Sequence, residues 1–208
     1  MALGLLLAQE RKTVDDRLRD FGGRCDVLWR ARCEKAGLPY PPARVRLLAL
    51  KAEKRLEVFG GRADGPWIFL AEVAVLAASG GPGPKLRQGD RQVPEGLYEI
   101  SALNPNSRFH VSLRVGYPNE EDRERAREDG RDALGGDIMI HGGAASIGCL
   151  AVGDPAAEEL FTLAARRRPT LLILPSDFRA GAPDPAGGPA WMAERYARLR
   201  GFAAELKR

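Results

Sequence analysis

The sequence predicts a mainly β domain of the α+β class, with helices added at both ends of the chain. Three observations predict this class. From Val45 onward, short apolar runs alternate with turn residues, as they do in a β sheet. Residues 12–36 and the end of the chain instead carry apolar side chains at helical spacing. A segment rich in glycine and proline, from Ser79 to Gly96, interrupts the strand pattern as a long loop.

Composition limits the number of domains and the kind of partner. A chain of 208 residues can form one well-buried domain with extensions but not two large domains. Hydrophobic residues make up 44% and charged residues 29%, which is typical of a globular protein. The net charge of +4 comes from 32 basic and 28 acidic residues that are interleaved along the chain. A nucleic-acid surface would show clustered basic residues, so we expect no nucleic-acid partner.

The N-terminus leaves the question of export open. No stretch approaches the roughly 20 apolar residues of a membrane-spanning helix, so we expect no membrane span. The opening MALGLLLAQE has an apolar run but no basic start. It is compatible with the remnant of a signal peptide or with a simple helical turn.

The first helical segment carries two of the three cysteines. We expect one or two short helices over residues 12–36, with Gly22 and Gly23 separating them. Cys25 and Cys33 lie eight residues apart, which is ~12 Å along a helix. Because a disulfide requires Cα atoms within ~7 Å, we expect two unpaired structural thiols.

The strand pattern is densest between residues 45 and 175. The predicted strands lie in VRLLALK, RLEVFG, PWIFLAEVAVLA, LYEI, RFHVSLRV, DIMIHGG, SIGCLAV and TLLILPS. Alternation in RFHVSLRV places His110 and Ser112 on one face and Phe109 on the other.

Helices are expected around and after these strands. The charged segment 120–132 is predicted to be a solvated loop or an exposed helix, with a mobile lid as the functional alternative. Asp154 is a candidate N-cap of a helix that follows SIGCLAV. The tail is predicted to be an amphipathic helix that docks on the domain, with Met192, Tyr196, Leu199, Ala203 and Leu206 on its apolar face.

The segment HGGAASIGC, from His141 to Cys149, is where a thiol and an imidazole share a short glycine-rich stretch. A cysteine attacks as thiolate, and a nearby imidazole lowers its pKa or takes its proton. Gly148 permits an unusual backbone geometry, and the amides beside it are candidates for binding an oxyanion. Ser146 is a candidate for orienting the imidazole or contacting substrate. The alternative is a buried cysteine beside a histidine whose role is structural.

Two other chemistries fit the sequence less well. A zinc site would require Cys149, His141 and His110 to converge from separate segments, since no CxxC pair is present. No GxSxG elbow indicates a serine nucleophile. We therefore expect neither a metal nor a cofactor.

The motif HGxxxSxGC after an apolar strand resembles the signature of the L,D-transpeptidase (YkuD-type) family. The blocks GPKLRQGDRQVPEGLYEI, LNPNSRFHVSLRVGYPN and IMIHGGAASIGCLAVGD resemble its YafK-like murein L,D-transpeptidase subgroup and extend over roughly residues 45–175. Two departures accompany the resemblance. Many members have a histidine where this chain has Ile147, and an arginine shortly after the cysteine where it has Leu150 and Ala151.

The resemblance implies a β-sandwich or barrel core around a cleft with Cys149 at its floor. It implies that Cys149 forms a thioester with a peptidoglycan stem peptide and that His141 acts as base. Ser146 and Gly148 would form the turn that shapes the oxyanion site. For binding the substrate, the matching positions are Lys85 and Arg91 in the long loop, His110 on its strand, and Gly142 in the histidine–glycine pair.

The same resemblance suggests how the chain is organised and where it acts. We expect a helical extension at 1–42, the catalytic domain at 43–178, and a linker with a helix at 179–208. The expected partners are peptidoglycan stem peptides in the periplasm or cell envelope, reached by export. An amine acceptor would make the protein a transpeptidase, and water would make it a hydrolase or amidase. A non-catalytic module that binds the cell wall is the third alternative. The sequence does not define the oligomeric state.

Overall fold

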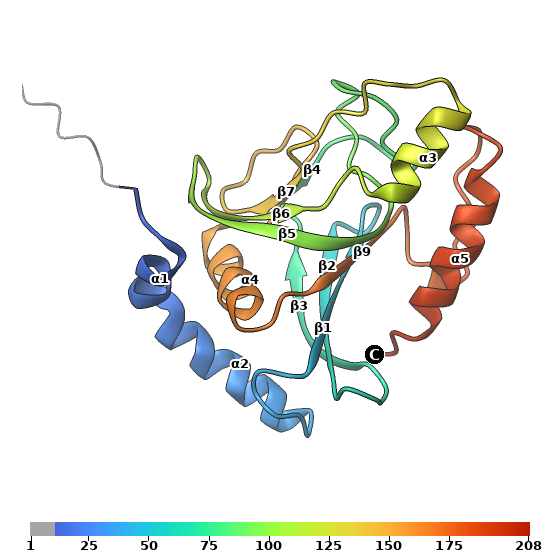
Figure 1. The fold of residues 1–208 in the computed structure, drawn as a ribbon. Helices are drawn as coiled ribbons and strands as arrows, with labels where there is room; N and C mark the ends of the chain where they lie inside the picture. Colours follow the sequence, from blue (N-terminus) through green and yellow to red (C-terminus); the bar gives the residue numbers. More distant parts are fainter. Residues whose placement is uncertain (1–10) are drawn as a thin grey trace, which may run out of the picture.

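The computed structural model describes residues 11–208, so the apolar run considered as a signal peptide lies outside the described residues. Nine strands form one hydrogen-bonded sheet in the order β3-β2-β1-β9-β5-β6-β7-β8-β4, with helices packed around it (Figure 1). This arrangement confirms the predicted α+β class with a mainly β core. No described helix has both the length and the apolar character needed to cross a membrane.

The strands occur where the apolar runs predict them. They are β1 (Arg44–Leu50), β2 (Arg55–Gly61), β3 (Ile68–Ala74), β4 (Ala77–Ala78), β5 (Gly96–Ser107), β6 (His110–Val115), β7 (Met139–His141), β8 (Leu150–Ala151) and β9 (Thr170–Leu174). The helical segments are α1 (Val14–Arg17), the π-helical turn η1 (Leu18–Gly22), α2 (Gly23–Lys35), α3 (Glu120–Glu128), α4 (Asp154–Arg166), the 3-10 turn η2 (Phe178–Ala180) and α5 (Met192–Ala204).

Strand β5 joins the two halves of the sheet. Its first residues, Gly96–Glu99, pair with β9, and its residues from Ile100 onward pair with β6. The register shifts between Ile100 and Ala102, and such irregularities bend and twist a strand. The expected sandwich or barrel is therefore built from one sheet that continues through β5.

The larger hydrophobic core lies between the sheet and helices α2 and α4. It includes Val58 of β2, Ile140 of β7 and Phe161 of α4, all fully buried. Helix α2 contributes Trp29, whose indole donates to the carbonyl of Glu159 at 2.8 Å. Burial of apolar surface of this kind is the main force that holds the layers together.

The N-terminal helix differs from the prediction at its glycines. Gly22 and Gly23 both have right-handed helical dihedrals, with φ of −60° and −58°, and the helix continues through them as η1 and α2. Cys25 and Cys33 lie on the same helix, buried and unpaired, as expected. The expected break at these glycines is therefore absent: Gly22 is buried against the core, and Gly23 is an exposed residue inside the helix.

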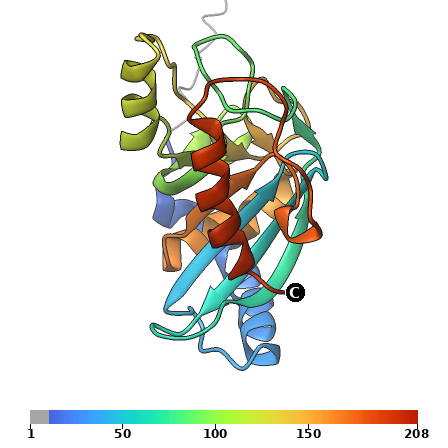
Figure 2. The same ribbon diagram turned by 90° about the vertical axis from the view of Figure 1, so that its right-hand side faces the viewer.

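Helix α5 covers the other face of the sheet. Figure 2 shows it crossing in front of the first strands. Its side chains Tyr196 and Leu199 are each 1% exposed and share a second core with Leu48 of β1 and Leu172 of β9. The predicted docking of an amphipathic C-terminal helix is confirmed.

Two features above the sheet set the surroundings of the site. The segment between Ser79 and Glu95 contains no helix or strand, as predicted from its glycine and proline content. The charged segment expected to be a loop or helix forms α3, which begins at a capping box between Asn119 and Asp122.

Candidate active site

The two residues expected to carry chemistry lie at the ends of one short parallel ladder. His141 ends β7, and Cys149 comes directly before β8. Ile140 pairs with Leu150 and His141 pairs with Ala151. Strands ~4.8 Å apart with a rise of ~3.3 Å per residue place the Cα atoms of His141 and Cys149 on the order of 8 Å apart. Positions two apart along a strand share a face, so strand geometry continued back from Leu150 to Cys149 would direct both side chains to one side of the sheet.

The imidazole of His141 is held in one tautomer. Its Nδ1 lies 2.6 Å from the carbonyl oxygen of Gly142. Because a carbonyl only accepts hydrogen bonds, Nδ1 carries the proton, and the Nε2 of the neutral ring is left with a free lone pair. Phe109 stacks on the ring with centroids 4.5 Å apart, and His141 is 2% exposed. The ring is thus fixed in orientation with Nε2 available as a base.

The surroundings of Cys149 favour the protonated form of its thiol. Its Sγ donates to the carbonyl oxygen of Asp137 at 3.6 Å. Burial raises the pKa of Cys149; a backbone hydrogen bond at Met139 lowers it, the charge of Asp137 raises it, and the charge of Lys85 lowers it. Of the two expected roles of the imidazole, lowering this pKa or taking the proton, the first is not among the causes of the shift. Burial dominates instead, so the thiol requires a base to remove its proton.

Ser146 closes the turn that carries the cysteine. Its Oγ accepts from the backbone N–H of Cys149 at 2.8 Å and donates to the carbonyl oxygen of the same residue at 2.5 Å. The expectation that Ser146 orients the imidazole is therefore wrong, since Gly142 does so. Gly148, with φ of 99°, takes the left-handed conformation that glycine allows.

The amides expected to form an oxyanion site have partners in this structure. The N–H of Cys149 donates to Ser146, and the N–H of Gly148 donates to Oγ of Ser79 at 2.5 Å. Each acceptor is a hydroxyl. An oxyanion could use these donors only by displacing the hydroxyl from them.

A set of hydrogen bonds joins the segment after His141 to the segment after Cys149. Val152 donates to the carbonyl of His141 at 2.9 Å, and Gly153 donates to that of Gly143 at 3.0 Å. Gly143 in turn donates to Oδ1 of Asp154 at 2.8 Å. Asp154 is the first residue of α4, and Gly153 occupies the N-cap position where we had expected Asp154.

Gly142 has a steric role where these two hydrogen-bonded segments meet. A Cβ at this position would lie 2.2 Å from Oδ1 of Asp154 and 2.7 Å from the carbonyl oxygen of Phe109. The residue is buried, and its N–H donates to Val111 at 3.3 Å. The expectation that Gly142 binds substrate is not supported by this placement. Only glycine fits where the two backbone segments cross.

A pocket of about 190 Å³ opens beside the cysteine turn. One wall comes from the 79–96 loop, one from the segment before β7, and the remainder from Ile147 and Gly148. Its lining residues are Lys85, Gln88, Gly89, Arg91, Gly135, Gly136, Asp137, Ile138, Ile147 and Gly148. The long loop thus borders the site, as its length and composition suggested.

Lys85 is committed to the loop itself. Its ammonium donates to Oδ1 of Asp90 at 2.6 Å and to the carbonyl of Arg87 at 3.0 Å, and Lys85 is 8% exposed. Burial opposes ionisation of Asp90, but hydrogen bonds from the backbone of Arg87, from Lys85 and from Gln92 outweigh it and lower the pKa of this carboxyl. Lys85 is therefore paired within the loop and is not a free cation.

Arg91 contrasts with Lys85. Its side chain is exposed, and within residues 11–208 its guanidinium pairs with no carboxylate. The backbone has a φ of 56°, which turns the residue at the edge of the pocket. Arg91 is the sequence-predicted cation that is available to an anionic ligand.

His110 lies on the opposite side from the expected one. Its Nε2 is 2.7 Å from Oε1 of Glu158 on α4, and its ring is 6.0 Å from that of Phe21. The positive φ of 70° at His110 interrupts the strand alternation, so Phe109 faces His141 while His110 packs toward the helices. His110 does not line the pocket beside Cys149.

No metal centre is evident in the part of the chain that the structure describes. Groups of three or more His, Cys, Asp or Glu side chains that could hold an ion are absent from residues 11–208. The zinc alternative therefore gains no support from the structure.

Several residues that shape the site were not predicted from the sequence for that role. Ser79, Asp137 and Phe109 contact the cysteine turn or the imidazole, and Oδ1 of Asp154 accepts from the N–H of Gly143. Their partners are distant in sequence, so no local pattern marks them. Phe109 precedes His110 in the strand pattern, but the positive φ at His110 interrupts the alternation, so the pattern does not predict that Phe109 faces His141.

Comparison with known proteins decides the family. The model of the L,D-transpeptidase catalytic domain, YkuD, matches residues 46–172, which is more than half of the chain. The chain belongs to this L,D-transpeptidase family. The YafK protein of Escherichia coli strain K12, named as an L,D-transpeptidase, is 34% identical over 119 residues, or 56% of this chain and 46% of its own length. The YafK protein of strain O157:H7 matches to the same extent.

A solved structure supports the fold of this L,D-transpeptidase domain. The helical cell shape determining protein Pgp2 from Campylobacter jejuni superimposes with a TM-score of 0.52 at 22% identity, covering 73% of this chain and 55% of its own. At this identity the likeness concerns the fold alone. The chain spans about half the length of the curated relatives it matches.

Proposed function

We propose that the protein is a cysteine-dependent acyl-transfer enzyme that acts on peptidoglycan stem peptides, with Cys149 as nucleophile and His141 as base. The observation that carries this proposal is the position of the two residues at the ends of the β7–β8 ladder, His141 as its last residue in β7 and Cys149 directly before β8, with Nδ1 of His141 satisfied by Gly142. That arrangement leaves Nε2 as the acceptor for the thiol proton. The family match supports a reaction of the L,D-transpeptidase class.

In the proposed first step, Nε2 of His141 takes the proton from Sγ of Cys149. The sulfur attacks the carbonyl carbon of the peptide bond at the L-centre of the diamino acid, and a C–S bond forms. The tetrahedral intermediate then expels the amine of the D-residue, which receives the proton from the imidazolium as the C–N bond breaks. The products are a thioester on Cys149 and a free D-amino acid.

In the proposed second step, a nucleophile releases the acyl group from Cys149. An amine from a second stem peptide would form a new amide, whereas water would release a shortened stem. His141, neutral again, removes the proton from either nucleophile and returns it to Sγ as the C–S bond breaks. Transfer is our leading proposal, because the family is named for it. A hydrolase or amidase that releases a wall-attached peptide or protein is the second candidate, and a non-catalytic wall-binding module would have no need of the oriented His141.

Arg91 is the proposed anchor for a substrate carboxylate. It lines the pocket beside Gly148, and it lacks the internal partner that Lys85 has in Asp90. We infer that Lys85 acts on Cys149 through its charge rather than by binding substrate. Replacing Arg91 with Asn, which tolerates the left-handed backbone, should raise the Michaelis constant for stems with a free carboxylate. Alkylation of Cys149 by neutral iodoacetamide should stay unchanged. If the Michaelis constant also stays unchanged, Arg91 is not the anchor.

The boundaries and place of action are also proposals. The family match at 46–172 lies inside the range 43–178 that we assign to the catalytic domain. A stem-peptide substrate implies action in the periplasm or cell envelope.

The test is incubation of the protein with purified tetrapeptide muropeptides, followed by mass spectrometry of the products. Cross-linked dimers indicate transfer, and stems shortened by one residue indicate hydrolysis. The Cys149→Ala variant serves as control. If neither product exceeds the amount formed by this variant, the proposed reaction is wrong.

A further inference from the structure

A buried ionic cluster connects helix α5 to the loop that borders the proposed active site. Glu95, at the end of this loop, is fully buried. Its Oε1 accepts from Nζ of Lys51 at 2.9 Å and from the N–H of Gly83 at 2.8 Å. Its Oε2 accepts from the hydroxyl of Tyr196 on α5 at 2.6 Å. A buried carboxylate persists only where such partners compensate for its lost hydration.

The cluster fastens both ends of the loop. Lys51 donates to the carbonyl of Gly83 at 2.8 Å near the start of the loop and to that of Val93 at 2.9 Å near its end. It also lies 3.3 Å from Oε1 of Gln92. The ammonium of Lys51, directly after β1, and the carboxylate of Glu95 in the loop therefore bring together backbone segments about ten residues apart.

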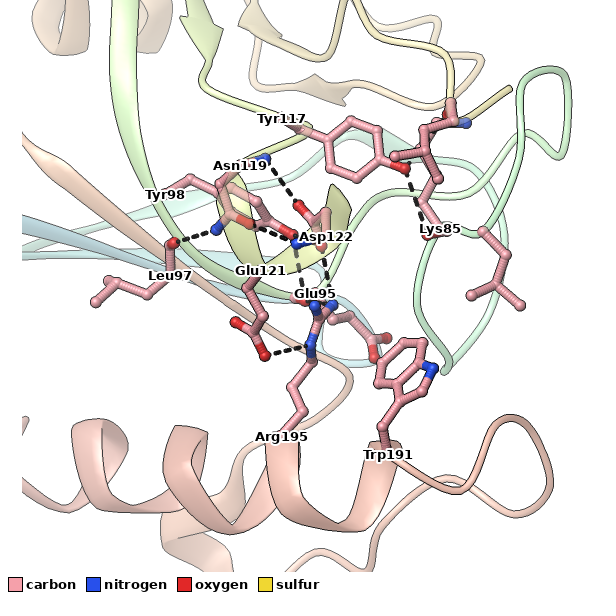
Figure 3. A network of polar contacts seen from close by, with 12 residues as sticks. Lys85, Glu95, Leu97, Tyr98, Tyr117, Asn119, Glu121, Asp122, Trp191 and Arg195 are labelled. Carbon is pink, nitrogen blue, oxygen red and sulfur yellow. Dashed lines mark hydrogen bonds and ion pairs between the residues drawn. The ribbon is translucent and has the colours of Figure 1, made fainter. Parts of the chain in front are cut away.

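Helix α5 adds a second attachment through Arg195. Its guanidinium donates to the carbonyl of Glu95 at 3.2 Å and pairs with Asp122 of α3 at 3.0 Å. Figure 3 shows Arg195 reaching from the helix toward both residues, with Tyr117 directed at Lys85 nearby. The hydroxyl of Tyr117 donates to the carbonyl of Lys85 at 3.4 Å. Two consecutive residues of α5, Arg195 and Tyr196, thus hold the end of the loop.

The loop in turn contacts the cysteine turn. Oγ of Ser79, at the start of the loop, donates to the carbonyl of Arg91 at 2.7 Å and accepts from the N–H of Gly148. Gly148 comes directly before Cys149. Hydrogen bonds therefore run without a gap from the loop to the residue beside the proposed nucleophile, and the charge of Lys85 in the same loop makes a small contribution that lowers the pKa of the thiol.

We propose that helix α5 sets the position of the active-site loop through the buried Tyr196–Glu95–Lys51 cluster, and that Tyr196 is a positioning residue for Cys149. Helix α5 lies outside residues 46–172, the part that matches the family. The role of Tyr196 in catalysis rests on the proposed function, but the hydrogen-bonded connection from α5 to the loop does not. Without the Tyr196 hydroxyl, Glu95 loses one of its donors, and the loop gains freedom on the side that faces Cys149.

The test compares Tyr196→Phe with Tyr40→Phe. Tyr40 also donates its hydroxyl to a carboxylate, Oδ1 of Asp26 at 2.5 Å, but it contacts neither the loop nor α5. Hydrogen exchange of the Gly83 and Gly148 amides should accelerate about tenfold in Tyr196→Phe, the size expected for loss of a hydrogen bond to a charged group. The same amides should be unaffected in Tyr40→Phe.

Two further readouts separate positioning from general destabilisation. The pH profile of Cys149 alkylation by iodoacetamide should move to higher pH in Tyr196→Phe, because the charge of Lys85 is held less firmly near the thiol. In a double-mutant cycle with Ser79→Ala, the effects on alkylation should be non-additive. If Tyr196→Phe proves too unstable to measure, Glu95→Gln keeps an acceptor for Tyr196 and should accelerate exchange at Gly83 in the same way.

Equal exchange rates and equal alkylation profiles in Tyr196→Phe and Tyr40→Phe would overturn the inference. Both measurements require only a folded protein and a thiol. They give an answer even if muropeptides are not substrates, so failure of the proposed function and failure of this inference are distinguishable.

Discussion

At the scale of single residues, the structure assigns different tasks to side chains that the sequence grouped together. The two histidines have separate partners: Nδ1 of His141 faces a carbonyl, while Nε2 of His110 faces the carboxylate of Glu158. The two loop cations also differ, since Lys85 is paired and Arg91 is exposed. Residue type and spacing identified the chemical groups. Their partners are distant in sequence and decide what each group can do.

The contrast between the histidines gives a first prediction. His141→Gln should lower the rate of single-turnover acylation by ~100-fold to 10,000-fold, which is the usual value of general base catalysis. His110→Gln keeps a donor for Glu158 and should leave the rate within a few-fold of the parent protein. Rapid-quench measurement of acylation for both variants checks this. Equal losses would show that His141 is not the base or that the base is shared.

The resting state of the thiol gives a second prediction. Since burial raises the pKa of Cys149, the thiolate fraction at neutral pH is small, and alkylation by iodoacetamide should keep rising above the pH at which an exposed thiol reaches its plateau. Asp137→Asn removes a negative charge that raises this pKa, so the profile should shift to lower pH. Because the Asp137 side chain is 81% exposed, the gain in rate at neutral pH should be only about twofold.

Asn also suits the φ of 55° at residue 137, so the backbone carbonyl that accepts from Sγ should stay in place. A parent profile that reaches its plateau below neutral pH would contradict this account of the thiol. It would mean that His141 and Cys149 exist as an ion pair at rest.

At the scale of the elements, strand positions followed from the sequence more closely than turns did. The runs VRLLALK and RLEVFG became β1 and β2 within one residue, because a buried strand needs a continuous apolar pattern. The predicted break at Gly22 and Gly23 was wrong, because glycine is compatible with a helix as well as with a break, and local sequence does not decide between them. The strand alternation is interrupted at His110 by a positive φ, which the hydrophobic pattern of the sequence does not predict.

The close approach of the segment after His141 to the segment after Cys149 gives a prediction at this scale. Gly142→Ala should lower the free energy of unfolding by about 1–3 kcal/mol, because its Cβ would overlap Oδ1 of Asp154 and the backbone of Phe109. Gly23→Ala is the control: its Cβ would meet no atom within 4 Å and its φ is helical. That variant should gain about 0.5–1 kcal/mol. Denaturant unfolding of both variants measures the difference, and a neutral Gly142→Ala would show that the turns are not tightly packed.

At the scale of the whole molecule, one sheet separates two hydrophobic cores that serve the site in different ways. The core under α2 and α4 supports the β7–β8 ladder, which includes His141 and begins in β8 directly after Cys149. The core under α5 lies beside the cluster that fastens the 79–96 loop. The fold class could be predicted from the sequence, and His141 and Cys149 remain the proposed reactive pair. The connection from the C-terminal helix to the loop could not be predicted, because Tyr196 and Glu95 are 101 residues apart and pair only once the chain has folded.

The central claim is that Cys149 carries the acyl group, and the most direct test is to trap that intermediate. The parent protein would be mixed with excess tetrapeptide stem, quenched in acid within one turnover, and examined by intact-mass and peptide-mapping mass spectrometry. The account predicts one adduct, equal in mass to the stem minus its terminal D-residue, on the peptide that contains Cys149. The adduct should be absent from Cys149→Ala and should form slowly in His141→Gln. An adduct that persists in Cys149→Ala, or products that accumulate in that variant at the parent rate, would contradict the account.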